Sequence, residues 1–195
     1  MTNSSAPKVF NLLVLVAALG YFVDIYDLLL FSVERINSLK GEKGILGPLA
    51  TDAEIGNVGM QLLNWQMGGM LIGGIFWGIL GDKKGRLSVL FGSILLYSLA
   101  NIANGFVQTV PQYALLRFIS GFGLAGELGA GITLVSETLS KEKRGIGTMI
   151  VATIGVFGAV VAGFMSNYIA NWRTSFFIGG GMGLTLLIMR IGVFE

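Results

Sequence analysis

Six long apolar stretches follow one another along this chain and account for most of its length. An α-helix needs about 20 apolar residues to cross the roughly 30 Å hydrocarbon core of a bilayer. A helix also satisfies its own backbone hydrogen bonds, which lipid cannot do. We therefore expect an all-α membrane protein with a single domain, residues 1–195, built from six transmembrane helices. Their approximate limits are 9–33, 58–80, 87–107, 113–135, 146–169 and 174–194.

The composition agrees with a membrane protein and excludes several other classes. Hydrophobic residues make up 53% of the chain and charged residues 12%, with a mean hydropathy of +0.75, which is too apolar for a soluble domain. Cysteine and histidine are absent, which excludes thiol catalysis and the commonest metal ligands. Neither a phosphate-binding GxxxxGK[ST] loop nor a basic stripe with interleaved aromatic residues occurs. We expect no enzyme activity, no cofactor, no metal ion and no nucleic-acid partner.

Lysine and arginine residues predict the orientation of the helices, because basic residues near the span ends are retained on the cytoplasmic side. One side of the expected membrane collects eight of them and the other side four. The eight are Lys8, Lys83, Lys84, Arg86, Lys141, Lys143, Arg144 and Arg190, and the four are Arg35, Lys40, Lys43 and Arg173. We expect a multi-pass protein of the inner (plasma) membrane, with both termini in the cytoplasm and a long outward loop over about 34–57.

The connection between the second and third stretches carries a recognisable motif. Residues 78–87 read GILGDKKGRL, which resembles the signature loop of the major facilitator superfamily, G-x-L-x-D-R-x-G-R-R/K. The matching positions are Gly78, Leu80, Asp82, Gly85 and Arg86. Gly85 suits a tight turn, and Asp82 and Arg86 can form ion pairs or cap helix ends. The alternative is an ordinary positive loop with one acid.

Two further segments resemble the same superfamily. Arg117 with Gly121 resembles its fourth-helix motif, and Gly126-Glu127 resembles its metabolite:proton symporter branch. Glu137 and Arg144-Gly145 resemble its second inner-loop motif, which contacts the signature loop and forms a cytoplasmic gate with it.

The resemblance covers nearly all 195 residues. It implies the N-terminal six-helix half of a transporter, made of two inverted three-helix repeats and working by alternating access. It also implies a second six-helix bundle as a partner, either a second copy or a separate C-terminal half.

The first stretch contains two acids that are candidates for proton coupling. Asp24 and Asp27 are spaced i, i+3 and share one helix face, which cannot point at lipid. The segment resembles the E-x-Y-D pattern of metabolite:proton symporters, with Asp24 in place of the usual Glu. Arg117 lies at a similar expected depth. When it approaches, the acid can release a proton, and when it withdraws, the acid can bind one again. A static salt bridge is the alternative.

Glu127 lies about 15 Å along the fourth helix from Arg117 and is a candidate for substrate or ion binding. Its alternative is pairing with a polar group on a neighbouring helix. Asn64 and Gln61 are polar residues of the second stretch that either line a cavity or bridge helices. Small residues spaced by four predict close helix packing. These pairs are Gly69/Gly73, Gly74/Gly78 and Gly179/Gly183.

Together these features predict transport of a small organic solute, coupled to protons by symport. The expected partners are the lipid bilayer, the small-molecule substrate, the proton and the second bundle. The competing prediction is a truncated domain without transport activity, or a membrane interaction subunit.

Overall fold

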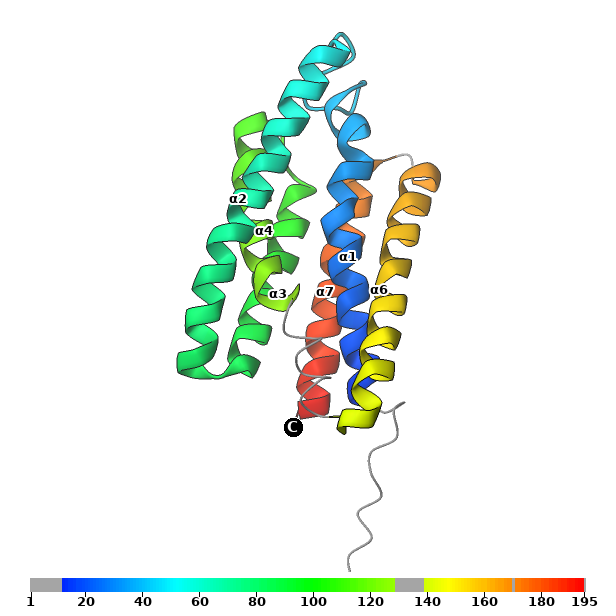
Figure 1. Ribbon diagram of the computed structural model, residues 1–195. Helices are drawn as coiled ribbons and strands as arrows, with labels where there is room; N and C mark the ends of the chain where they lie inside the picture. The colour runs from blue at the N-terminus through cyan, green and yellow to red at the C-terminus, as the bar shows by residue number, and fades with distance from the viewer. Residues whose placement is uncertain (1–11, 129–138, 170, 195) are drawn as a thin grey trace, which may run out of the picture.

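The computed structural model describes residues 12–128, 139–169 and 171–194, and these residues form six helices and no strand (Figure 1). The helices are α1 (Leu12–Leu39), α2 (Asp52–Lys84), α3 (Arg86–Asn104), α4 (Val110–Leu128), α6 (Lys141–Tyr168) and α7 (Trp172–Phe194). Successive helices run in opposite directions, so that α1 begins and α7 ends at the same end of the bundle (Figure 1).

Helix length and apolar character support the membrane prediction. Among the described residues, three helices contain stretches long and apolar enough to cross a membrane, Val14–Leu39, Lys141–Tyr168 and Trp172–Gly192. A shorter apolar helix covers Ser88–Asn104. α2 has 33 residues, but the polar side chains of Gln61, Asn64 and Gln66 lower its hydropathy. The predicted six-helix, all-α fold is confirmed, whereas the limits of the membrane spans within these helices stay a prediction.

The helices pack as two groups of three. One group contains α2, α3 and α4, and the other contains α1, α6 and α7. α2 packs along α4 in one group, and α6 packs along α1 in the other (Figure 1). α3 packs on α4, α7 packs on α1, and α3 and α7 join the two groups. Exchanging the first three helices for the last three leaves this packing pattern unchanged. The predicted inverted repeat of three helices is therefore visible in the contacts.

Glycines allow the closest of these helix contacts. Gly69 and Gly73 of α2 lie directly against the backbone of Phe118 and Phe122 on α4. Gly158 of α6 lies in the same way against the backbone of α1. A Cβ atom at any of these positions would collide with backbone, which cannot move aside as a flexible side chain can. The prediction of close packing at Gly69/Gly73 is confirmed.

The other two glycine pairs have different outcomes. Gly179 of α7 lies against α1, and Gly183 lies against α3, so that this prediction is also confirmed. Gly74 and Gly78 of α2 have no atoms of the described chain within 4 Å of an added Cβ. No close packing forms at this pair within the described chain, because this side of α2 faces away from the bundle.

The connection between α1 and α2 is shorter than the predicted loop of about 34–57. α1 continues to Leu39 because Glu34, Ser38 and Leu39 are buried against the rest of the bundle. The segment between the helices is therefore residues 40–51.

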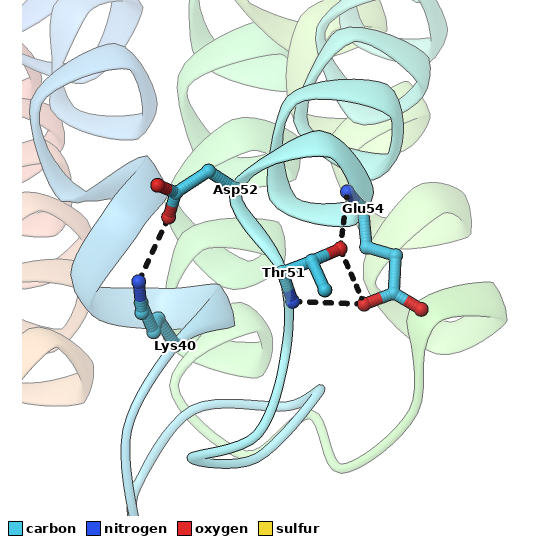
Figure 2. A network of polar contacts seen from close by, with 4 residues as sticks. All are labelled: Lys40, Thr51, Asp52 and Glu54. Atoms are coloured by element: carbon cyan, nitrogen blue, oxygen red, sulfur yellow. Dashed lines mark hydrogen bonds and ion pairs between the residues drawn. The ribbon is translucent and has the colours of Figure 1, made fainter.

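α2 begins with a capping box at Thr51, which Figure 2 shows. The Glu54 backbone N–H donates to Thr51 Oγ1 (3.3 Å), and the Thr51 N–H donates to Glu54 Oε2 (2.8 Å). Lys40 Nζ forms an ion pair with Asp52 Oδ1 at 2.8 Å. These hydrogen bonds hold the pKa of Asp52 and of Glu54 below their ordinary values. The Lys40–Asp52 ion pair thus connects the residue after α1 to the first residue of α2.

Replacing Gly73 with Ala should destabilise the bundle by about 1–3 kcal/mol, because its methyl group would press on the α4 backbone at Phe122. The matched control is Gly74→Ala, the next residue of the same helix, whose methyl group meets no described atom. We expect the control to be neutral or slightly stabilising. Denaturant titration of the chain in mixed micelles, followed by circular dichroism, measures both. Equal stability of the two variants would contradict the close packing of α2 on α4.

Candidate functional site

Five charged side chains are buried where α1, α3, α4 and α7 meet. None is more than 3% exposed. They are Asp24 and Asp27 of α1, Arg117 and Glu127 of α4, and Arg190 of α7. Charges in an apolar bundle are costly unless they are paired or hydrogen-bonded. The expectation that the acids of the first and fourth stretches turn away from lipid agrees with this burial.

The five charges divide between two clusters at different levels of the bundle. Arg117 and Glu127 are ten residues apart on α4, which is about 15 Å along the helix axis. Asp27 interacts electrostatically with Arg117, and Asp24 with Glu127 and Arg190. We call Asp27, Arg117, Asn101 and Asn104 the Arg117 cluster. We call Asp24, Glu127 and Arg190 the Arg190 cluster.

Amides and aromatic rings hold Arg117 in its cluster. Its Nη2 donates to Asn101 Oδ1 (3.0 Å), and its Nε donates to Asn104 Oδ1 (3.4 Å). The guanidinium carbon lies 4.7 Å from the ring centre of Phe176 and 5.6 Å from that of Phe31. The remaining nitrogen, Nη1, has no hydrogen-bond partner among the described residues. Both of these hydrogen bonds of Arg117 are thus made to α3 rather than to an acid.

Asp27 is buried beside Arg117 without being bonded to it. Neither of its carboxyl oxygens has a hydrogen-bond partner in the described part of the chain. No ion pair between the two side chains is found there, although the charge of Arg117 acts on Asp27. The α7 backbone at Gly179 lies directly against Asp27 Oδ1. The structure thus brings the predicted partners together, and the role of the pair stays a prediction.

Arg190 belongs to the site and was missed by the sequence analysis. Its Nη2 forms an ion pair with Glu127 Oε1 at 2.6 Å, and the side chain is 3% exposed. Its interpretation as one of eight cytoplasmic basic residues was therefore wrong. The available signal was its position inside an apolar stretch, where an ionisable residue normally has a partner. The alternative reading of Glu127, pairing with a polar group on a neighbouring helix, describes this contact.

Gly20 of α1 makes room for the ion pair. A Cβ atom at this position would collide with Arg190 Nη2 and lie 3.0 Å from Glu127 Oε1. Asp24 stands one turn further along the same helix, and the buried Tyr97 of α3 closes the cluster. No group of three acidic side chains placed to hold a metal ion is found in the ranges that the structure describes.

Glu34 is a further buried acid that the sequence analysis did not select. Ser175 Oγ donates to its Oε1 (2.8 Å), and Asn37 Nδ2 donates to its Oε2 (3.0 Å). The Tyr26 hydroxyl donates to the Ser175 backbone carbonyl (3.1 Å), which links this acid to the residue before Asp27. Glu34 was taken as the start of a loop, and only the position of α7 makes it an interior residue.

Gln61 and Asn64 do not join either cluster. Both are exposed on α2 and line a surface groove of about 400 Å³ with Phe118 of α4. Glu127, with which they were grouped as cavity residues, is buried in the Arg190 cluster instead. The structure therefore does not bring these three predicted cavity residues together.

The signature loop adopts the backbone that its sequence predicts. Gly85 has φ of 88°, a conformation that favours glycine, between the end of α2 and the start of α3. Gly78 and Asp82 lie in the last turns of α2, and Asp82 is exposed without a hydrogen bond or ion pair among the described residues. Arg86 begins α3, and its side chain lies outside the described part.

The second inner-loop motif is described only in part. Glu137 lies outside the described residues. Arg144 is exposed in the first turn of α6, and its Nε donates to the Leu139 backbone carbonyl at 3.0 Å. The predicted contact between this motif and the Asp82 loop stays a prediction.

A sequence model of the Major Facilitator Superfamily matches residues 10–194 of the chain. The niacin transporter NiaP of Acinetobacter baylyi is 36% identical over 57% of this chain and 26% of its own length. A putative metabolite transport protein of Haemophilus influenzae is 30% identical over 84% of this chain and 38% of its own length. The 3-(3-hydroxy-phenyl)propionate transporter of Escherichia coli is 33% identical over 63% of this chain.

Solved structures share the fold at low sequence identity. The xylose transporter XylE of Escherichia coli, in a partially occluded inward-open conformation, superposes with a TM-score of 0.72 and 18% identity. The superposition covers 91% of this chain and 48% of that one. The chain thus corresponds to less than half the length of the transporters that it matches.

Substitution of Gly20 by Ala should push Arg190 away from Glu127 and destabilise the bundle by about 1–3 kcal/mol. Gly163→Ala in α6 is the control, because no described atom lies near an added Cβ there. In an Arg190→Met background the cost of Gly20→Ala should shrink, since the colliding atoms are gone. Detergent-denaturation midpoints measure the four variants. An unchanged cost in that background would contradict this contact.

Proposed function

Because the chain belongs to the Major Facilitator Superfamily, we propose that it forms the N-terminal half of a proton-coupled transporter for a small organic solute. Transporters of this kind expose a central site alternately to the two sides of the membrane. The matched relatives with printed activities are transporters, which supports solute transport. Coupling to protons rests on the buried acids of α1.

The observation that carries the proposal is the environment of Asp27. Its carboxyl group is buried, forms no hydrogen bond among the described residues although the Asn101 amide is near, and stands beside an arginine that is bonded elsewhere. An isolated buried carboxylate is costly, whereas a protonated carboxyl group or one paired with arginine is not. Asp27 can therefore bind a proton when Arg117 moves away and release it when Arg117 returns, as the bundle changes conformation. Asp24 lies on the same helix face and is proposed as a second acid for proton coupling.

Transport requires a second bundle, which we propose to be another copy of this chain or a separate C-terminal half. The apolar side chains of α2 and α6 that face outward supply surface for lipid and for such a partner. Superfamily halves are related by an axis along the membrane normal, and a second copy can adopt that relation because α1 begins and α7 ends at one end of the bundle.

We place that end in the cytoplasm of a plasma-membrane protein. Lys83, Lys84, Lys141, Lys143 and Arg144 gather there, even after Arg190 is removed from the count. The signature loop and the start of α6 lie at the same end (Figure 1). Gly78, Asp82, Gly85, Arg86, Glu137 and Arg144 are proposed to form the cytoplasmic gate there.

The relatives suggest which solutes to test first. Niacin and 3-(3-hydroxyphenyl)propionate are carried by two of them, and inorganic phosphate by other relatives from rice. Xylose is carried by the structural neighbour, whose low identity supports only the fold. Uptake of these four labelled compounds into proteoliposomes, with and without an inward proton gradient, tests both the substrate class and the coupling.

The competing function is a membrane domain without transport activity. Copy number distinguishes the two, because half of a transporter is inactive alone. Native mass spectrometry of the purified chain in lipid nanodiscs should give a defined dimer if two copies form the transporter. A monomer would direct the search to a separate C-terminal half, which must then restore uptake when co-expressed. Failure of both arrangements would favour the domain without transport activity.

Replacing Asp27 with Asn should abolish accumulation driven by the proton gradient while leaving the folded chain intact. The amide keeps the size of the side chain but cannot exchange a proton. Asp52→Asn is the matched control, since Asp52 is an exposed carboxylate at the start of α2. We expect the control to retain full uptake. If Asp27→Asn accumulates the solute as the native chain does, the coupling role of Asp27 is excluded.

A further inference from the structure

The Arg190 cluster contains one more negative group than positive ones. Asp24 and Glu127 are each 1% exposed and Arg190 is 3% exposed, so that bulk water screens none of them. With both acids ionised the cluster would carry a net charge of −1 inside the bundle. An uncompensated buried charge is strongly unfavourable.

The contacts within the cluster leave an acid oxygen without a donor. Glu127 Oε1 pairs with Arg190, and the Tyr97 hydroxyl also lies within reach of Glu127, but no described hydrogen bond reaches Asp24 Oδ1. The Asp24 and Glu127 carboxyl groups lie close enough to form a hydrogen bond with each other. Two carboxylates have no hydrogen to place between them. A proton on one of the two acids supplies the missing donor.

No other described cation faces this cluster. Arg117 is about 15 Å away along α4 and is bonded to amides of α3. α1 contributes a further acid, Asp27, and α3 contributes the neutral Tyr97. The charged residues of α2 and α6 all lie in the first or last turns of those helices. Within the described part of the chain, the negative charge of the two acids is therefore opposed by the Arg190 guanidinium group alone.

We propose that Asp24 and Glu127 share a single proton and so form, with Arg190, a second proton-binding site separate from Asp27. Gain of the proton forms one O–H bond on either carboxyl group and makes the cluster neutral. Its loss breaks that bond and leaves two carboxylates facing one arginine. Such a pair titrates as a unit, because the ionisation of one acid opposes that of the other. The site itself does not depend on the proposed function, although its use in transport does.

Infrared difference spectroscopy of the purified chain in lipid tests the site directly, because a protonated carboxyl group absorbs separately from carboxylates and amides. Asp24→Asn and Glu127→Gln should each remove the absorption of one carboxylic acid. In either variant the remaining acid pairs with Arg190 as a carboxylate. The double variant should also lose one carboxylic acid and no more, which is the signature of a shared proton. Exchange into deuterated water identifies the band.

Two outcomes would overturn the proposal. A loss of two carboxylic acids in the double variant would mean that each acid holds its own proton. A loss of none would mean that both acids are ionised. Asp27→Asn is the control and should remove a different band without altering the shared one.

Arg190→Met gives an independent check, since both acids should then be protonated and the count should rise by one. Thermal stability of each variant shows that it remains folded, and the isosteric Asp24→Asn and Glu127→Gln variants decide the question if Arg190→Met does not fold. These measurements need no substrate and no second bundle. If the uptake assay fails, the infrared result can still be interpreted. If the infrared result contradicts the shared proton, the coupling role of Asp27 is still tested separately by uptake.

Discussion

The need to satisfy charged groups inside an apolar bundle governs the arrangement of this protein. Five charged side chains from α1, α4 and α7 are buried at the centre, and each has to find a counter-charge, a hydrogen bond or a proton there. That requirement fixes which faces of the three helices meet. Gly20, which lies beside the Arg190–Glu127 pair, leaves room for these two side chains to meet.

The two clusters satisfy their charges in different ways. Arg117 is held by asparagine amides and aromatic rings, and Asp27 forms no hydrogen bond or ion pair with it in the part of the chain that the structure describes. Arg190 is bonded directly to an acid, and a second acid stands beside that pair. We propose that Asp27 binds a proton when Arg117 moves away, and that Asp24 and Glu127 hold one proton between them. Both clusters lie where helices of the first three-helix repeat contact helices of the second.

The repeat also explains why the outer faces of α2 and α6 are both apolar and exposed. α2 and α6 occupy equivalent places, each packed along the central helix of its group and each exposing large apolar side chains outward. In a membrane such faces contact lipid or a second bundle without the cost that they would have in water. The similarity to one half of longer transporters agrees with this arrangement.

The sequence by itself determined the helices, the turn at Gly85 and the burial of Asp24, Asp27, Arg117 and Glu127. Helix formation follows from apolar length, and a charge within a span is costly whichever helix lies beside it. Only the tertiary structure decided the partners: Arg190 for Glu127, asparagines for Arg117, and Ser175 for Glu34. A basic residue near a helix end can extend its long side chain to the membrane surface or turn inward to a buried partner. Which it does depends on the face of the neighbouring helix, and that is set by packing between residues far apart in the chain.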